Sequence, residues 1–117
     1  MQQYTNYPLL QHNTFQMDIR AALYVEYNSV DELCQFLSST DFEHHRNRFI
    51  HIGAGSNLLF AGDYNGLVLH SAIHDLEVVE DTSEYQLLRV GSGYVWDDLV
   101  AYCVDHKLAG IENLSAI

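Results

Sequence analysis

A glycine-containing turn between two apolar runs limits the folds open to this chain more than any other feature. It reads Gly53-Ala54-Gly55-Ser56-Asn57 and stands between Phe49-Ile50-His51-Ile52 and Leu58-Leu59-Phe60. Glycine permits positive φ and lacks the Cβ that would hold a ligand away, so a Gly-x-Gly turn can point successive N–H groups at one anion. Ser56 and Asn57 add side-chain donors. The pattern indicates either a phosphate-binding turn after a strand or a glycine turn that only reverses the chain, which is commoner.

Strand patterns recur on both sides of this turn. Residues 22–27, 49–52 and 67–70 predict single strands, and residues 76–79 with 86–90 predict a pair around the polar turn at 81–84. Asp63-Tyr64-Asn65-Gly66 predicts a further turn. Residues 1–12 are polar and aromatic without a period, and they predict an N-terminal arm, loose or pinned.

Two helices are predicted among these strands. Ser29 and Glu32 form a capping box that opens a helix through Leu37, and residues 96–106 form a second amphipathic helix. The order indicates an α+β fold, α/β-like, with a mixed small sheet and two main helices. A Rossmann unit would place Gly-x-Gly-x-x-Gly at the start of a helix with an acidic residue about twenty positions later, and this chain does not.

The composition fits one globular domain that avoids polyanions. The chain has 117 residues, of which 48% are hydrophobic, and a formal net charge of −11. That charge would repel nucleic acid and anionic membrane surfaces. An anionic cofactor can still bind where local backbone dipoles act, because salt screens the overall field over about 8–10 Å. No stretch resembles a signal peptide or a membrane span, so we expect a cytoplasmic protein without nucleic-acid or membrane partners.

Cysteines and histidines give no chemical site in this sequence. Cys34 and Cys103 lie on apolar stripes of the two predicted helices, which predicts buried free thiols. Seven histidines include the adjacent His44 and His45, with His51 nearby. Their spacing matches no zinc-site pattern, so we expect no metal and solvated loop histidines at 44 and 45.

Other candidate groups have ordinary explanations. Asp97 and Asp98 suit the first turn of a helix better than acid–base chemistry. Trp96 heads an apolar stripe and is expected in the core, which leaves Tyr94 as the better cofactor contact. Ser56 is expected to donate to phosphate, because a nucleophilic serine would need a base at hand and His51 is five residues earlier on a strand.

Five blocks follow one another along residues 13–117. They are Asn13-Thr14-Phe15, then Gly53 to Phe60, then Gly66-Leu67-Val68-Leu69, then Gly91-Ser92-Gly93 with Trp96, Leu99 and Val100, and finally Gly110-Ile111-Glu112-Asn113-Leu114 before Ile117. In this order and spacing they resemble the flavin-dependent UDP-N-acetylenolpyruvoylglucosamine reductases of peptidoglycan precursor synthesis. The chain departs from the family pattern at Gln16, where glycine is usual, so the backbone turn after Phe15 is open to question.

The resemblance implies FAD as the cofactor, held between two α+β subdomains of the vanillyl-alcohol-oxidase type. Residues 13–117 would then be the first part of the FAD domain. The implied cofactor-binding residues are Gly53, Ala54, Gly55, Ser56 and Asn57 around the pyrophosphate, Asn13 and Thr14 near the flavin, and Gly91, Ser92, Gly93, Asn113 and Ile117 along the cofactor.

Members of that family continue beyond the position of Ile117 into more of the FAD domain and a substrate domain. The implied reaction takes hydride from NADPH to FAD and then to the enolpyruvyl group of a UDP-sugar, with a serine, an arginine and a glutamate outside the matched region. We therefore expect no catalytic residue in this chain, and an inactive fragment that can self-associate. Two alternatives stay open: a non-catalytic flavin- or nucleotide-binding module, and a related FAD oxidoreductase with another substrate.

Overall fold

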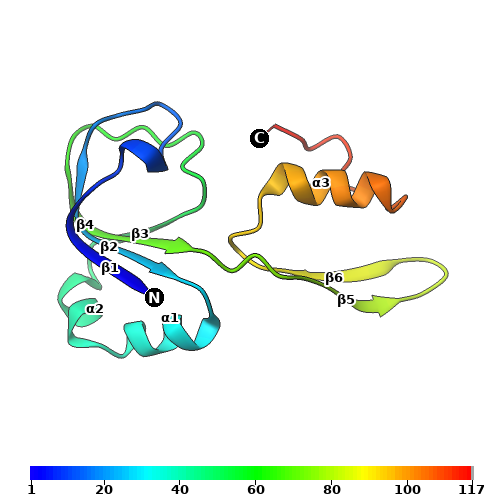
Figure 1. Ribbon diagram of the computed structural model, residues 1–117, viewed down its shortest axis with the longest axis horizontal. Helices are drawn as coiled ribbons and strands as arrows, with labels where there is room; N and C mark the ends of the chain where they lie inside the picture. The colour runs from blue at the N-terminus through cyan, green and yellow to red at the C-terminus, as the bar shows by residue number, and fades with distance from the viewer. Residues whose placement is uncertain (117) are drawn as a thin grey trace. The chain divides into compact units, whose positions relative to one another are not determined.

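The computed structural model describes residues 1–116 and divides into two compact units, Met1–Ala72 and Ile73–Ile117. Both units combine helix and strand (Figure 1), which agrees with the predicted α+β class and its small sheets. The sequence predicted one domain, whereas the contacts separate two units. Each is described by itself below.

The first unit is built on a four-stranded mixed sheet. Its strands are β1 (Gln2–Pro8), β2 (Arg20–Tyr27), β3 (Phe49–Ile52) and β4 (Tyr64–Ser71), in the spatial order β1-β2-β4-β3. β1 is antiparallel to β2, whereas β2, β4 and β3 run parallel. Central parallel strands are covered on both faces, and this explains the long apolar runs of β2 and β4.

Each face of this sheet carries its own hydrophobic cluster. One cluster contains Leu23, Val25, Phe36, Leu67 and Leu69. The other contains Leu9, Ile19, Ala21, Tyr24, Ile52, Phe60 and Val68. Ala21 and Leu23 should share a face by strand alternation, but the pairing register shifts between them. That irregularity turns Ala21 toward the Tyr24 side, where the glycine loop also packs.

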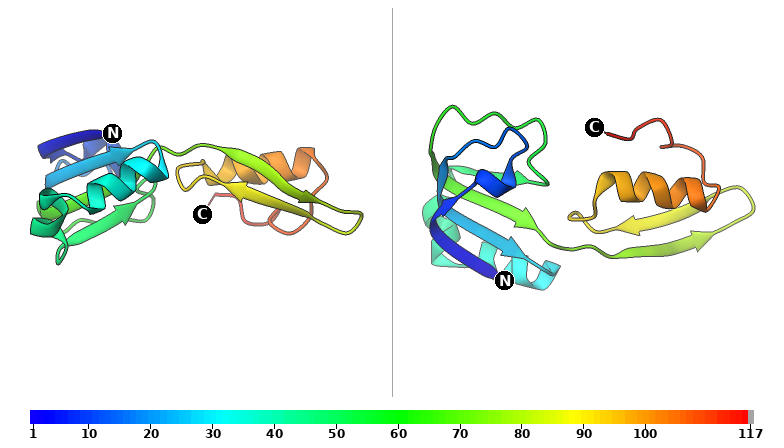
Figure 2. Two further views of the ribbon diagram at one scale, coloured as in Figure 1. Left: turned by 90° about the horizontal axis from the view of Figure 1, so that it is seen from below. Right: turned by 45° about the horizontal axis from the view of Figure 1, so that its top comes forward.

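Helices α1 (Val30–Leu37) and α2 (Thr40–His45) lie on one face of the sheet, as Figures 1 and 2 show. The predicted cap of α1 is present, because Ser29 Oγ accepts from the backbone N–H of Glu32 at 3.2 Å. The Glu32 carboxylate returns to the N–H of Asn28 at 2.8 Å, one residue earlier than a standard capping box. The short 3-10 helix η1 (Leu10–His12) follows β1.

Two predictions about backbone structure in this unit differ in outcome. Of the two alternatives for the N-terminal arm, loose or pinned, the structure shows the pinned one: its residues Gln2–Pro8 form β1, which pairs with β2 from Gln2 opposite Glu26 to Pro8 opposite Arg20. The expected turn at residues 63–66 is instead the start of β4. Asp63 accepts a hydrogen bond from the backbone N–H of Arg20 at 2.9 Å, and Tyr64 pairs with Ala21, so long-range partners override the local turn pattern.

Two predictions about the helices were wrong, one about a side chain and one about the backbone. Cys34 is exposed, and the buried residue of α1 is Phe36, whose ring meets that of Phe42 at 6.0 Å between centroids. His44 is exposed as predicted, but His44 and His45 lie in the last turn of α2, a helix that the sequence did not predict, and not in a loop. Cys103, in contrast, is buried as predicted.

The second unit pairs β5 (Leu76–Asp81) with β6 (Gln86–Val90) in antiparallel register and carries α3 (Trp96–Asp105). These bounds agree closely with the predicted strand pair and helix. Val100 and Cys103 are the buried residues of α3. A pocket of about 270 Å³ lies between β6 and α3, lined mainly by apolar side chains such as Leu88, Val90 and Leu99. The core of this unit is therefore thin.

Candidate functional site

The glycine loop follows β3 directly and adopts the backbone conformation that its sequence predicts. Gly55 has φ +74° and Asn57 has φ +60°. Within residues 1–116, the backbone N–H groups of residues 53–57 donate to no other group of the chain. Successive N–H groups in a turn with positive φ form a concavity that suits an anion. We call residues 53–57 the phosphate cradle.

Gly55 is the residue of the phosphate cradle that packs most closely against the rest of the chain. A Cβ built at this position would lie 1.9 Å from the carbonyl oxygen of His12, so only glycine fits here. The carbonyl of Gly55 accepts a hydrogen bond from the N–H of Thr14 at 3.2 Å. The structure thus brings two separately predicted stretches, Asn13-Thr14 and the glycine loop, into direct contact.

Asn13 is buried, and its side chain is fully occupied within its own turn. Its amide nitrogen donates to the carbonyls of Leu9 at 2.7 Å and Met17 at 3.2 Å, and its amide oxygen accepts from the N–H of Met17 at 2.9 Å. These bonds close the segment between η1 and β2. Asn13 therefore shapes the wall of the phosphate cradle through the backbone, while cofactor binding by its side chain stays a prediction.

The backbone turn after Phe15 forms although Gln16 stands where the family usually has glycine. Gln16 adopts φ +54°, in the left-handed region that glycine usually fills, and its N–H donates to the carbonyl of Asn13 at 3.2 Å. A non-glycine residue in this region costs roughly 1 kcal/mol or more. The neighbouring Phe15 side chain is 57% exposed.

The glycine turn at residues 91–93 belongs to the second unit, and two of its backbone N–H groups donate to carbonyl groups of that unit. The N–H of Gly91 donates to Asp75 at 2.8 Å, and that of Gly93 donates to Ile73 at 2.9 Å. A Cβ at Gly91 would lie 2.3 Å from the carbonyl oxygen of Ile73, so close backbone approach explains this glycine. Cofactor contacts by Gly91, Ser92 and Gly93 stay predictions.

The segment after α3 is tied to that helix by polar contacts. Trp96 Nε1 donates to the carbonyl of Leu114 at 2.6 Å, and Asp97 accepts from the N–H of Ala116 at 2.7 Å. Trp96 is 39% exposed, so its expected core position was wrong. Glu112 accepts from the N–H of Gly110, and this bond lowers the pKa of its carboxyl. Asn113 is exposed, and the predicted cofactor residue Ile117 lies outside the described residues.

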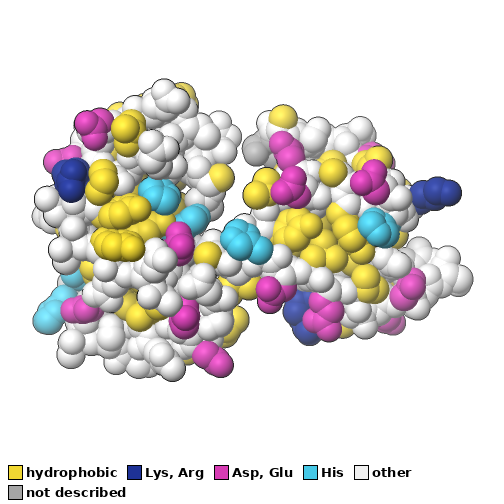
Figure 3. Space-filling view, viewed as in Figure 1, with side chains coloured by type: hydrophobic (Ala, Val, Ile, Leu, Met, Phe, Trp, Pro, Cys, Tyr) yellow, Lys and Arg dark blue, Asp and Glu magenta, His cyan; other side chains and the backbone are white. Residues whose placement is uncertain are grey.

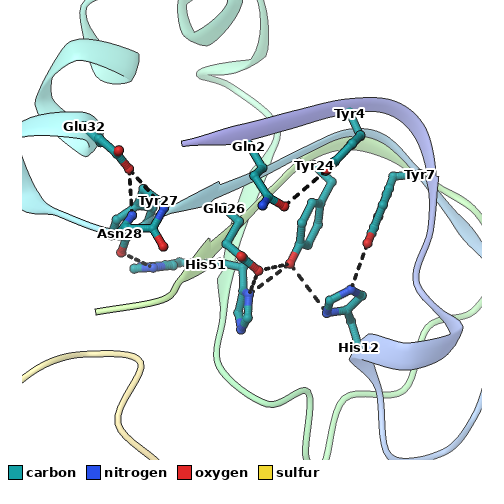
Figure 4. Close-up of polar contacts among 11 residues, drawn as sticks. Gln2, Tyr4, Tyr7, His12, Tyr24, Glu26, Tyr27, Asn28, Glu32 and His51 are labelled. Carbon is teal, nitrogen blue, oxygen red and sulfur yellow. Dashed lines mark hydrogen bonds and ion pairs between the residues drawn. The ribbon is translucent and has the colours of Figure 1, made fainter. Parts of the chain in front are cut away.

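A cluster of histidines and tyrosines beside the phosphate cradle was not predicted from the sequence (Figure 4). We call it the His–Tyr cluster, and its members are Tyr7, His12, Tyr24, Glu26 and His70. Tyr24 is 1% exposed, and its hydroxyl donates to Glu26 at 3.1 Å and meets His70 Nδ1 at 2.9 Å. The only sequence signal is that Tyr24 and Glu26 are two residues apart on one strand.

Hydrogen bonds, burial and neighbouring charges shift the pKa values of three members of the His–Tyr cluster. The hydrogen bond from His70 is the main cause that lowers the pKa of Glu26. Burial, followed by repulsion from His70, lowers the pKa of His12, while Glu26 opposes that shift. Burial and the charge of Glu26 raise the pKa of Tyr24. Among residues 1–116, no three histidine, cysteine or acidic side chains are placed to hold a metal ion.

The chain matches one family of known proteins. Residues 21–117 match the family described as FAD binding domain. The chain belongs to this FAD-binding family. The phosphate cradle, β3, β4 and all of β2 except Arg20 fall within the matched residues, and the match supports the prediction of FAD as the cofactor.

Individual relatives of this FAD-binding chain carry one enzyme name. It is 50% identical over 111 residues to the UDP-N-acetylenolpyruvoylglucosamine reductase of Bacteroides fragilis, covering 95% of the chain and 32% of that protein. Proteins of the same name from Porphyromonas gingivalis and Aliivibrio fischeri are 39% and 34% identical, over 96% and 100% of the chain and 32% and 33% of their own lengths. The chain spans about a third of these relatives, and the similarity to this reductase family is confirmed.

The structure also bears on membrane insertion. None of the helices within residues 1–116 has the length and apolar character needed to cross a bilayer.

Proposed function

We propose that the phosphate cradle binds the pyrophosphate of FAD. One observation carries this proposal: the N–H groups of residues 53–57, in the described chain, have no protein acceptor, although Gly55 is buried. Leaving a buried donor unpaired costs about 1–3 kcal/mol, and a diphosphate oxygen would supply the missing acceptor. The contact of Gly55 with residues 12–14 holds these donors in place before a ligand arrives, so less ordering free energy is lost on binding.

The residues of the chain fit this role without a cationic side chain. Ser56 and Asn57 are exposed at the rim and offer side-chain donors, and Gly53 leaves open space above the backbone. Thr14 stands at the same rim. Bound FAD would supply the hydride-transfer chemistry, while the chain binds and orients its diphosphate.

We further propose that the chain is the N-terminal part of a cytoplasmic NADPH-dependent enzyme that reduces UDP-N-acetylenolpyruvoylglucosamine to UDP-N-acetylmuramate. The names of the relatives support this, as does their length, about three times the matched region. The missing two thirds would complete the FAD domain and add the substrate site, which makes the chain alone inactive. We call the proposed longer enzyme the parent protein.

The finer fold assignment is part of the same proposal. The phosphate cradle is followed in the chain by β4 and not by a helix, which supports a two-subdomain FAD fold over a Rossmann fold. In that setting residues 13–117 form the first subdomain after a short arm. Asn13, Gly91, Ser92, Gly93, Asn113 and Ile117 would then lie along the rest of the cofactor.

The cradle can be tested with two matched substitutions in the parent protein. A Cβ at Gly53 or at Gly62 meets no atom of the chain within 4 Å, so the two positions are matched for the substitutions Gly53→Val and Gly62→Val. Only Gly53 belongs to the phosphate cradle. We expect Gly53→Val to weaken FAD binding about tenfold or more in a fluorescence titration, because its side chain occupies space near the anion, while Gly62→Val binds as the unchanged protein does. Equal affinities would contradict the proposal.

Activity of the parent protein separates the remaining functions. UDP-N-acetylenolpyruvoylglucosamine should accelerate NADPH oxidation by the FAD-loaded enzyme. FAD binding without NADPH oxidation would favour a non-catalytic module, and oxidation that ignores this UDP-sugar would favour a related oxidoreductase. The isolated chain should purify without the yellow absorbance of bound flavin, because half of a binding cleft leaves most of the cofactor in water.

A further inference from the structure

His12 connects the phosphate cradle to the His–Tyr cluster. Its backbone forms the wall against Gly55, since the carbonyl oxygen and carbon of His12 would lie 1.9 and 2.7 Å from a Cβ there. The next two residues continue this contact, through the buried Asn13 and the hydrogen bond from Thr14 to Gly55. A movement of His12 therefore changes the shape of the cradle.

The side chain of His12 lies at the hydroxyl ends of two stacked tyrosine rings, Tyr7 and Tyr24 (Figure 4). Its ring centroid lies 4.9 Å from that of Tyr24 and 5.6 Å from that of Tyr7. Nε2 is 3.3 Å from the hydroxyl of Tyr7, and Nδ1 is 3.5 Å from the hydroxyl of Tyr24, at the long limit of a hydrogen bond. Neutral imidazole satisfies both contacts, with Nε2 as acceptor and Nδ1–H as donor.

The charges around His12 make its protonated form costly in this position. Groups from three strands face His12: Tyr7 on β1, Tyr24 and Glu26 on β2, and His70 on β4. Behind them, Tyr4 on β1 stacks on Tyr7, and His51 on β3 interacts electrostatically with His70. Glu26, the acidic member of the cluster, contacts His70 at 2.9 Å. A charge on His12 would lie half-buried beside His70, which is paired with Glu26, and without a carboxylate in contact.

We propose that His12 is a positioning residue of the phosphate cradle, and that its protonation withdraws the ring from Tyr7 and Tyr24 and loosens the cradle at Gly55. The effect on cofactor binding rests on the proposed function of the cradle. The movement of the cradle does not, and it can be measured without any ligand. The proposal and simple electrostatic attraction predict opposite changes in anion affinity. A loosened cradle weakens anion binding at low pH, whereas attraction by an imidazolium would strengthen it.

The movement is tested by NMR on the 117-residue chain between about pH 8 and pH 5. The backbone amides of Gly55 and Thr14 should shift with the same midpoint as the imidazole C–H signals of His12. The variant His12→Phe keeps a ring beside the two tyrosines but cannot titrate, and it should abolish these shifts. The matched control His44→Phe, at an exposed position of α2, should keep them.

Three results would overturn the proposal. They are amides of Gly55 and Thr14 that do not titrate, amides that titrate with a midpoint different from that of His12, and shifts that persist in His12→Phe. The variant His12→Gln, which keeps a donor and an acceptor but has no titration, serves the same purpose if the phenylalanine variant does not fold.

Binding is tested separately with FAD and the parent protein. The pyrophosphate diester of FAD keeps its charge over this range, so a change in affinity belongs to the protein. We expect FAD to bind about tenfold more weakly at pH 5.5 than at pH 7.5, and equally at both in His12→Phe. Equal or tighter binding at pH 5.5 in the unchanged protein would overturn the coupling. If FAD shifts no amide of residues 53–57 at any pH, the proposed function fails, while the NMR titration still decides the role of His12.

Discussion

At the scale of single residues, two glycines of one loop should respond oppositely to the same change. Gly55→Ala places a methyl group 1.9 Å from the carbonyl oxygen of His12 and forces alanine to φ +74°, so we expect it to lower the free energy of unfolding by about 1–3 kcal/mol. Gly53→Ala meets nothing within 4 Å and should be neutral or stabilising by up to about 1 kcal/mol. Urea denaturation of both variants measures the difference, and equal midpoints would refute it.

The titrating side chains of the first unit predict how its stability changes with pH. The pKa values of His12 and His51 are lowered from 6.5 in the folded state, mainly by burial, so the unfolded chain takes up their protons first as the pH falls. The free energy of unfolding should therefore be highest above about pH 6.5 and decline below it.

Glu26 acts in the same direction at lower pH. Because the hydrogen bond from His70 lowers its pKa from 4.5, its contribution is present above that value and is lost as the pH falls through the folded-state pKa. Urea denaturation from pH 7.5 to pH 4 measures the decline. His51→Gln should flatten the upper part of the curve relative to the control His44→Gln, which is also at an exposed position, and a stability that rises on acidification would contradict the assignment.

At the scale of elements, the cap of α1 is the contact most clearly set by local sequence. Ser29→Ala removes the acceptor for the N–H of Glu32, and such a loss costs about 1 kcal/mol. Ser83→Ala, at an exposed position in the turn between β5 and β6, is the matched control. Thermal melts should show a lower midpoint for Ser29→Ala alone. No difference between the variants would mean that the Glu32 contacts hold the helix start without the serine.

Elements with a strong local pattern could be predicted, and those defined by distant partners could not. The β5–β6 pair and α3 each carry their own periodicity or caps. β1 is polar and mostly exposed, and only its pairing with β2 and the stacking of Tyr7 on Tyr24 at 4.4 Å make it a strand. In α1 several apolar residues compete for the buried face, and packing against α2 selects Phe36 over Cys34.

The candidate site likewise contains one part that the sequence predicted and one part that it did not. The glycine loop and Asn13-Thr14 carry recognisable residue patterns, and the structure joins them through Gly55 and Thr14. The His–Tyr cluster draws its members from β1, η1, β2 and β4, so no window of sequence contains it. Its assembly depends on sheet order, which local patterns do not encode.

At the scale of the whole molecule, the chain leaves several large apolar side chains exposed. In the second unit Val79 on β5, Leu87 on β6 and Val104 on α3 are 44%, 50% and 54% exposed. Figure 3 also shows hydrophobic side chains gathered on the face of that unit that it draws. Exposed apolar surface favours association. We therefore expect the isolated chain to self-associate, although its net charge of −11 opposes close approach at low salt.

Light scattering at two salt concentrations tests this expectation. Because salt screens the repulsion between like charges and leaves apolar contact in place, the mean mass should rise from low to high salt. The double variant Val79→Lys and Leu87→Lys should stay closer to one chain under both conditions, while lysines at the polar, exposed positions Ser83 and Ser115, which add the same charge, should suppress association less at high salt. A chain that remains a monomer at high salt would contradict this expectation. It would show that the core between β6 and α3 stabilises the second unit without contact to another chain.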